Sequence, residues 1–233
     1  MRIMKTFVLA LWAATTALPV AAQQDSRPGL AVLPFENGGS YGRTRDDYDA
    51  LRRGIAGLMI SELSRNPAVR LVDRAETARL LDEQALTSSG RVDAATAAQV
   101  GKLVGAKYMV TGSFIDMYGE FRLDARIINV ETGEILKTVR SDPQFKDIKQ
   151  LDRIIQSVAE RVMSETRLAQ LAPAPTTQAG GEVPTEALIL YSRALLYEDH
   201  GEKAKAIEYY QKALRQFPAF TEAELGLRKA KGS

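Results

Sequence analysis

The chain has 233 residues, with 31 basic and 29 acidic side chains and no cysteine. The absence of cysteine excludes disulfides, thiol catalysis, cysteine-based metal sites and a lipid anchor carried by cysteine. The balanced charge, without a basic stripe interleaved with aromatic residues, argues against nucleic-acid binding.

Residues 1–22 have the three parts of a secretory signal. Arg2 and Lys5 supply the positive start, a short apolar run follows, and Val20-Ala21-Ala22 places small residues at the cleavage positions. The run is too short and too rich in Ala and Thr for a good membrane span, so cleavage before Gln23 is favoured over a retained anchor. Loss of Arg2 and Lys5 leaves 29 basic and 29 acidic side chains, a net charge of zero.

Residues 23–171 predict an α/β domain that begins with a buried strand. The continuous apolar run at 29–36 is typical of a strand buried on both faces, and the residues after it form a break. Apolar residues at helical spacing come next, and Asp73 and Asp93 are each placed to cap a helix. The further elements predicted here are a helix at 45–66, a strand at 69–72, and helices at 74–85 and 94–104.

Three strand-like runs follow, at 107–117, 121–130 and 135–139. Tight turns around Gly119 and Gly133 join them, which predicts an antiparallel meander. The middle run alternates apolar and charged residues, so one of its faces should be buried and the other solvated. A last helix over 145–171 carries an apolar stripe that fits either the sheet or a second subunit.

A linker rich in Pro, Gly and Thr at 172–183 separates this domain from a helical C-terminus. Residues 184–233 predict one tetratricopeptide-like hairpin, turning at Gly201, with a capping helix at about 221–231. Small residues should let its two helices approach each other, aromatic residues should fill the space beside them, and a proline should end the hairpin. These residues are Ala194, Ala206, Ala213, Tyr197, Tyr210 and Pro218. The predicted fold is therefore an α/β domain with helices on a mixed sheet, followed by a small all-α hairpin. A single repeat cannot bury its apolar face alone, so this hairpin should pack on the α/β domain or on another chain.

The motifs of residues 29–140 resemble those of the CsgG family in order and spacing. They are Ala31-Val32-Leu33-Pro34-Phe35, Leu71-Val72-Asp73-Arg74, Leu80-Leu81-Asp82-Glu83-Gln84, and residues 101–113 and 125–135. The family includes the curli secretion protein and, more distantly, LpoB-type activators of peptidoglycan synthases and the N-terminal domain of TolB. The resemblance implies an α/β fold in an envelope setting, with structural roles for Asp73, Arg74, Glu83, Gly112 and Gly133. Lacking the anchor and extra hairpins of the curli protein, this chain is not expected to form a secretion pore alone.

No residue set predicts catalysis or metal binding. His200 is the only histidine and adjoins the hairpin turn at Gly201, so neither a Ser-His-Asp arrangement nor a histidine metal site is indicated. Asp46, Asp47 and Asp49 resemble part of a calcium loop but lack the remaining ligands.

Two further groups have structural interpretations. Gly101-Lys102 with Gly105 lacks the spacing of a phosphate-binding loop, so close packing of a helix on the sheet is the prediction. Glu83, Arg74 and Arg126 form a family-specific surface cluster, or lie on solvated faces or in an ordinary ion pair, and the second interpretation is favoured.

The predicted protein-contact residues are Tyr41, Arg43 and Arg45, in the loop after the first strand and at the start of the next helix, and Tyr197 and Tyr210 in the hairpin. We therefore expect a non-catalytic periplasmic protein without a cofactor, which binds envelope proteins in envelope assembly or curli-like secretion. A homo-oligomer and peripheral association with the outer membrane are compatible with this expectation. The alternatives are an LpoB-like regulator of a peptidoglycan synthase, a TolB-like envelope component, and a small-ligand sensor or enzyme.

Overall fold

The computed structural model describes residues 25–83, 93–165 and 181–232. The strands are β1 Gly29–Val32, β2 Glu36–Asn37, β3 Arg70–Leu71, β4 Tyr108–Met117, β5 Glu120–Asn129 and β6 Ile135–Arg140. The helices are α1 Arg45–Ser64, α2 Arg74–Glu83, α3 Ala94–Leu103, the 3-10 turn η1 Ile148–Gln150, α4 Leu151–Glu165, α5 Thr185–Asp199, α6 Lys203–Gln216 and α7 Thr221–Lys231. The predicted signal at 1–22, the loop at 88–90 and the linker up to residue 180 lie outside the described residues.

The six strands form one mixed sheet in the order β3-β1-β4-β5-β6, with β2 paired to β4. β1 runs parallel to β3 and β4, whereas β4, β5 and β6 are antiparallel neighbours. Asp73 and Asp93 accept hydrogen bonds from the backbone N–H groups of Ala75 and Thr96, as caps of the two helices that follow. The predicted mixed α/β fold with its antiparallel meander is confirmed.

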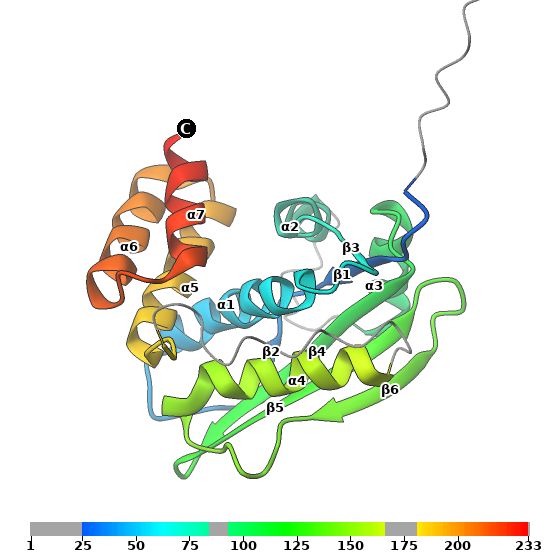
Figure 1. Ribbon diagram of the computed structural model, residues 1–233, viewed down its shortest axis with the longest axis horizontal. Helices are drawn as coiled ribbons and strands as arrows, with labels where there is room; N and C mark the ends of the chain where they lie inside the picture. The colour runs from blue at the N-terminus through cyan, green and yellow to red at the C-terminus, as the bar shows by residue number, and fades with distance from the viewer. Residues whose placement is uncertain (1–24, 84–92, 166–180, 233) are drawn as a thin grey trace, which may run out of the picture.

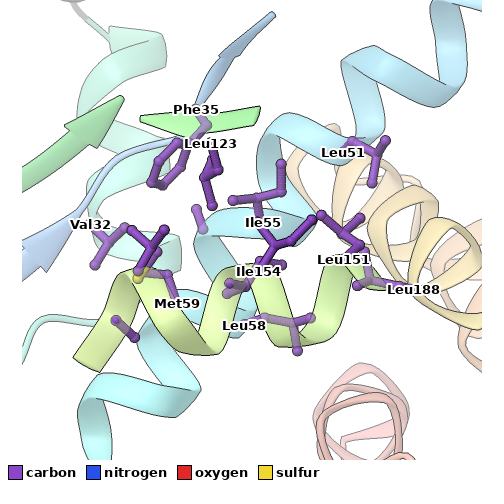
Figure 2. Packing of buried hydrophobic residues seen from close by; sticks show 14 of the residues in the cluster. Val32, Phe35, Leu51, Ile55, Leu58, Met59, Leu123, Leu151, Ile154 and Leu188 are labelled. Carbon is purple, nitrogen blue, oxygen red and sulfur yellow. The ribbon is translucent and has the colours of Figure 1, made fainter. Parts of the chain in front are cut away.

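Helices cover the two faces of the sheet unequally. α1 and α4 lie on one face along most of its length (Figure 1), and they bury Phe114, Leu123 and Ile127. α2 and α3 cover only part of the other face, where Met109 and Ile128 are buried. Figure 2 shows side chains of α1, α4 and the sheet meeting in the larger cluster. The stripe of α4 therefore packs within this chain.

Two local details differ from the predictions. The helix expected from residue 145 begins with the turn η1 and becomes α-helical at Leu151, because the Asp147 side chain accepts from the Lys149 N–H and caps the segment there. The short strand β2 was not predicted, since Glu36 and Asn37 have no apolar alternation to reveal them. Its parallel pairing with β4 is set by the tertiary structure.

The C-terminal helices form the predicted hairpin, and α5 packs along α1 (Figure 1). Two α1 glycines make this close approach possible. A Cβ atom at Gly54 would lie 1.7 Å from the Ser192 Oγ, and one at Gly57 would lie 2.8 Å from the Tyr191 hydroxyl. Leu188 of α5 joins the same apolar cluster as α1 and α4 (Figure 2). The face that a lone repeat cannot bury is therefore covered by the α/β domain.

Candidate partner-binding surface

The turn between β4 and β5 presents an aromatic ring to solvent. Tyr118 and Gly119 have φ values of +56° and +79°, as a two-residue hairpin turn of type I′ requires. Glycine adopts a positive φ freely, but the same backbone conformation is strained in a tyrosine. Among the described residues, Tyr118 is the one residue other than glycine with a positive φ. Tyr118 is 89% exposed, so the strain is not offset by burial of the ring.

The loop after β2 brings a second tyrosine to this turn. Tyr41 is half-exposed, and its ring meets that of Tyr118 edge-on at 5.5 Å between centroids. Its backbone N–H donates to the Asp116 carbonyl of β4, and the Tyr48 hydroxyl donates to the Asp116 carboxylate at 2.8 Å. Burial, followed by this contact, raises the pKa of Tyr48 to about 12. The two exposed rings are therefore held on an ordered support, and they are called the aromatic tip below.

The predicted arginines of this loop have different surroundings. Arg43 forms an ion pair with Glu186 at the start of α5, at 3.1 Å, and thus connects the loop to the hairpin. Arg45 is 93% exposed in its side chain and lies 3.8 Å from Asp49. Such an exposed pair contributes little to stability, so Arg45 is free to contact another molecule.

The hairpin tyrosines differ as well. Tyr197 is partly exposed, stacks on Tyr209 at 5.2 Å and lines an open pocket of about 340 Å³ between α1 and α5, together with Arg52 and His200. Tyr210 is fully buried and donates its hydroxyl hydrogen to Glu198. The prediction of Tyr210 as a contact residue is therefore wrong, because its ring fills the space between the hairpin helices and is closed to a partner.

Buried ion pairs fix the hairpin to the α/β domain. Asp199, at the end of α5, accepts from Arg53 of α1 at 2.9 Å and from Arg74 of α2 at 2.5 Å. All three side chains are at least 85% buried. Asp47 near the start of α1 similarly accepts from Arg193 of α5 at 2.6 Å. Paired and hydrogen-bonded charges of this kind fix one geometry, because an unpaired buried charge would be costly.

Glu83, Arg74 and Arg126 do not form a cluster in the structure. Arg74 pairs with the hairpin, Glu83 pairs with Arg79 on its own helix, and Arg126 lies on β5. Glu83 thus forms an ordinary exposed ion pair, whereas Arg74 belongs to a buried one.

The predicted structural residues lie at close approaches and turns. Ala194, Ala206 and Ala213 are buried where the hairpin helices meet, and Gly133 and Gly201 have positive φ in their turns. Pro218 follows the end of α6, in the turn before α7. Gly112 lies in β4, where a Cβ atom would be 2.0 Å from the Asp124 carbonyl oxygen. The Gly101 prediction is also confirmed, since a Cβ there would meet Val130 and Met109 of the sheet layer.

Acidic side chains gather where the hairpin meets α1 and α4. The pKa of Asp152 is raised to about 6, mainly by burial. A hydrogen bond from the Val183 N–H lowers this pKa, and the negative charges of Glu62, Glu182 and Glu222 raise it further. Glu222 accepts from the Ser61 hydroxyl through one carboxylate oxygen, while its other oxygen is buried and has no hydrogen-bond partner among the residues that the structure describes. This junction is therefore electrostatically unfavourable when its carboxylates are ionised.

We expect Asp152→Asn to stabilise the protein at neutral pH by about 1–2 kcal/mol. A carboxyl whose folded pKa is raised contributes its full stability below the unfolded value of 3.8 and loses it as the pH rises through about 6. The asparagine oxygen can still accept from Val183. Urea unfolding at pH 7.5 and pH 4 should show the gain at pH 7.5 and its disappearance at pH 4, whereas an equal gain at both would contradict the assignment.

Within the described ranges, no group of three or more His, Asp or Glu side chains is placed to hold a metal ion. In the same ranges, no helix is long and apolar enough to span a bilayer.

The fold defines a mixed α/β domain with a helical hairpin docked on one of its helices. Residues 13–120 match the family model described as curli production assembly/transport component CsgG, and residues 187–220 match the tetratricopeptide repeat. The two matches confirm the predicted resemblances to the CsgG family and to the tetratricopeptide repeat. No curated protein sequence matches the chain significantly.

Several solved structures are similar to this chain. The C-terminal domain of LpoB from Salmonella enterica is 20% identical, with 51% of this chain and 85% of that chain covered, at a TM-score of 0.34. TolB from Acinetobacter baumannii is 14% identical, with 61% and 28% covered, at 0.36. The PelC dodecamer from Paraburkholderia phytofirmans is 14% identical, with 62% and 90% covered, at 0.38.

Proposed function

We propose that this chain is a non-catalytic, exported factor of the bacterial envelope that binds other proteins during envelope assembly or curli-like secretion. The description of the matched family concerns curli production, assembly and transport, and it supports the setting. The tetratricopeptide repeat supports action through protein binding. Export is supported by the signal-like pattern of residues 1–22, and N-terminal sequencing of the mature protein should find Gln23 first.

The observation that carries the binding proposal is the aromatic tip. A strained turn residue costs about 1–2 kcal/mol relative to glycine, yet position 118 holds an exposed ring that meets the Tyr41 ring edge-on. Strain of this kind is retained where the surrounding structure and the function require the side chain. Tyrosine is also enriched among the residues that dominate protein–protein affinity. Recognition of a partner protein therefore accounts for both the strain and the exposure.

Photo-crosslinking in intact cells of the source bacterium tests this proposal. A photo-reactive phenylalanine analogue at position 118 should crosslink to a defined envelope protein, and adding Tyr41→Ala should weaken that crosslink. The control places the analogue at Leu225, which is 52% exposed on α7. No crosslink from position 118, or the same products from both positions, would rule out the aromatic tip as the binding surface.

We further expect Tyr118→Gly to separate binding from folding. Relief of the strain, about 1–2 kcal/mol, is partly offset by the larger entropy that glycine loses on folding, about 0.5–1 kcal/mol. The variant should therefore be as stable as the unmodified protein or more stable by up to about 1.5 kcal/mol. Loss of the exposed ring should nevertheless reduce recovery of the crosslinked partner in pull-down by at least about tenfold, the size of a hot-spot effect. Unchanged recovery with unchanged stability would show that the ring has no binding role.

A further inference from the structure

The strand β6 forms an open edge of the sheet. Among the described strands it is last in the order and has β5 as its single neighbour. The Ser141 N–H donates to the Leu123 carbonyl, and backbone groups alternate along an antiparallel strand, so those of Thr138 point away from β5. Arg161 already donates to the Arg140 carbonyl, so among the described residues the open backbone groups of this edge are those of Thr138 and the Arg140 N–H. Ile135 and Leu136 at its start are each 48% exposed.

Beside this edge, the sheet face opposite α1 and α4 carries exposed arginines, on a part that α2 and α3 do not bury. Arg122 and Arg126 point outward from β5, and Arg140 lies across from Asp124 on β6. Asp124 contacts the Nε atoms of Arg122 and Arg140 at 3.1 and 2.8 Å, so it orients both guanidinium groups while their terminal nitrogens keep no acceptor in the described part of the chain. Arg126 has no ion pair there at all. The three arginines and Asp124 are called the arginine face below.

We propose that β6 and the arginine face bind an extended, acidic segment of a partner protein, which adds to the sheet as a seventh strand. An unpaired strand edge is complementary to a peptide backbone, which supplies the N–H and C=O groups that the edge lacks. Side chains of the added strand alternate between the two faces of the sheet. Those on the outer face would come beside Thr138 and Arg140 and within reach of Arg126. Carboxylates at these positions would meet the free guanidinium nitrogens, and an apolar residue would cover Ile135 and Leu136.

The charges of the edge argue against a second copy of this chain as the occupant. Two antiparallel β6 strands meeting edge to edge would join the arginine faces of both copies into one surface, each with three arginines and one aspartate. Like charges on neighbouring strands are unfavourable. A polysaccharide or nucleic acid is disfavoured because the outward residues of β5 and β6 include no aromatic ring for stacking. An acidic protein segment satisfies both the backbone edge and the arginine face.

The proposal is tested with the mature protein and two capped heptapeptides. The acidic probe is Thr-Val-Glu-Val-Glu-Val-Thr, and the basic probe has Lys in place of Glu. Nuclear magnetic resonance titration should show the acidic probe shifting the amide signals of β6, with at least tenfold weaker binding of the basic probe. Arg126→Glu and Arg140→Glu should each weaken the acidic probe at least tenfold, whereas Arg215→Glu, at an exposed position of α6, should not.

Thr138→Pro tests the strand addition itself. Proline removes the outward N–H without removing a bond to β5, so this variant should fold and should no longer bind the acidic probe.

Retained binding, or equal binding of both peptides, would overturn the proposal, as would a dimer of the unmodified protein that Thr138→Pro dissociates. Equal competition by polyphosphate, without shifts of the β6 amides, would assign the face to a polyanion instead. That the segment belongs to a protein partner rests on the proposed function, but the titration is independent of the crosslink at position 118, so either can fail alone.

Discussion

Asp199→Ala is expected to lower the free energy of unfolding by about 3–5 kcal/mol, the usual cost of removing one member of a buried ion pair. Asp199 is 6% exposed and accepts from both Arg53 and Arg74. Its loss leaves two guanidinium groups largely buried without their shared carboxylate. Because these arginines lie on α1 and α2 while Asp199 ends α5, the hairpin should separate from the α/β domain before the sheet unfolds.

Urea unfolding followed by circular dichroism measures the loss, and hydrogen exchange of the α5 amides measures the separation. Glu186→Ala is the matched control. It also removes a carboxylate of α5 that pairs with an arginine of the α/β domain, but Glu186 is 67% exposed, so the change should cost less than about 1 kcal/mol. Similar losses in the two variants would show that burial of the Asp199 network does not determine the docking of the hairpin.

Local sequence patterns predicted most of the elements because their causes are local. Apolar spacing gave α1 and the antiparallel strands, and the side chains of Asp73 and Asp93 mark the starts of α2 and α3. The short strands β2 and β3 have two residues each, and their limits depend on what they pair with in the sheet. Their length could therefore not be read from their own residues.

The docking of the hairpin had weaker signals. Asp199 is 146 residues from Arg53 and 125 from Arg74, and no spacing rule connects positions so far apart. Gly54 and Gly57 are a signal that the sequence does contain. Two glycines three residues apart in an amphipathic helix indicate the close approach of another element. That pattern shows that something packs on α1, but not that it is α5.

The sequence predicted the two parts of the aromatic tip but not their contact. A turn around Tyr118 and Gly119 was predicted, and Tyr41 was singled out as a loop residue. Their contact depends on the anchoring of the loop to Asp116, through the Tyr41 N–H and the Tyr48 hydroxyl. Exposure of Tyr118 follows from this arrangement and could not be inferred from a turn pattern alone.

Gly112→Ala is expected to destabilise the protein by about 3 kcal/mol or more, beyond the usual range for overpacking. The added Cβ would lie 2.0 Å from the Asp124 carbonyl oxygen and 2.7 Å from the Phe35 ring. The carbonyl belongs to the neighbouring strand β5, so relief requires β4 and β5 to separate. The same displacement would move Asp124, and with it the arginines that Asp124 orients.

Gly101→Ala is the matched control, because the added Cβ would there collide with side chains and not with a backbone carbonyl. A Cβ there would meet the Val130 and Met109 side chains at 2.5 and 2.9 Å, and the helix propensity of alanine offsets about 1 kcal/mol of the cost. Flexible side-chain ends can move where a strand carbonyl cannot, so this variant should lose less than about 2 kcal/mol. Thermal and urea unfolding of both variants measure the difference. A Gly112→Ala protein as stable as Gly101→Ala would mean that β4 and β5 can separate locally at little cost, and the arginine face would then not be a rigid surface.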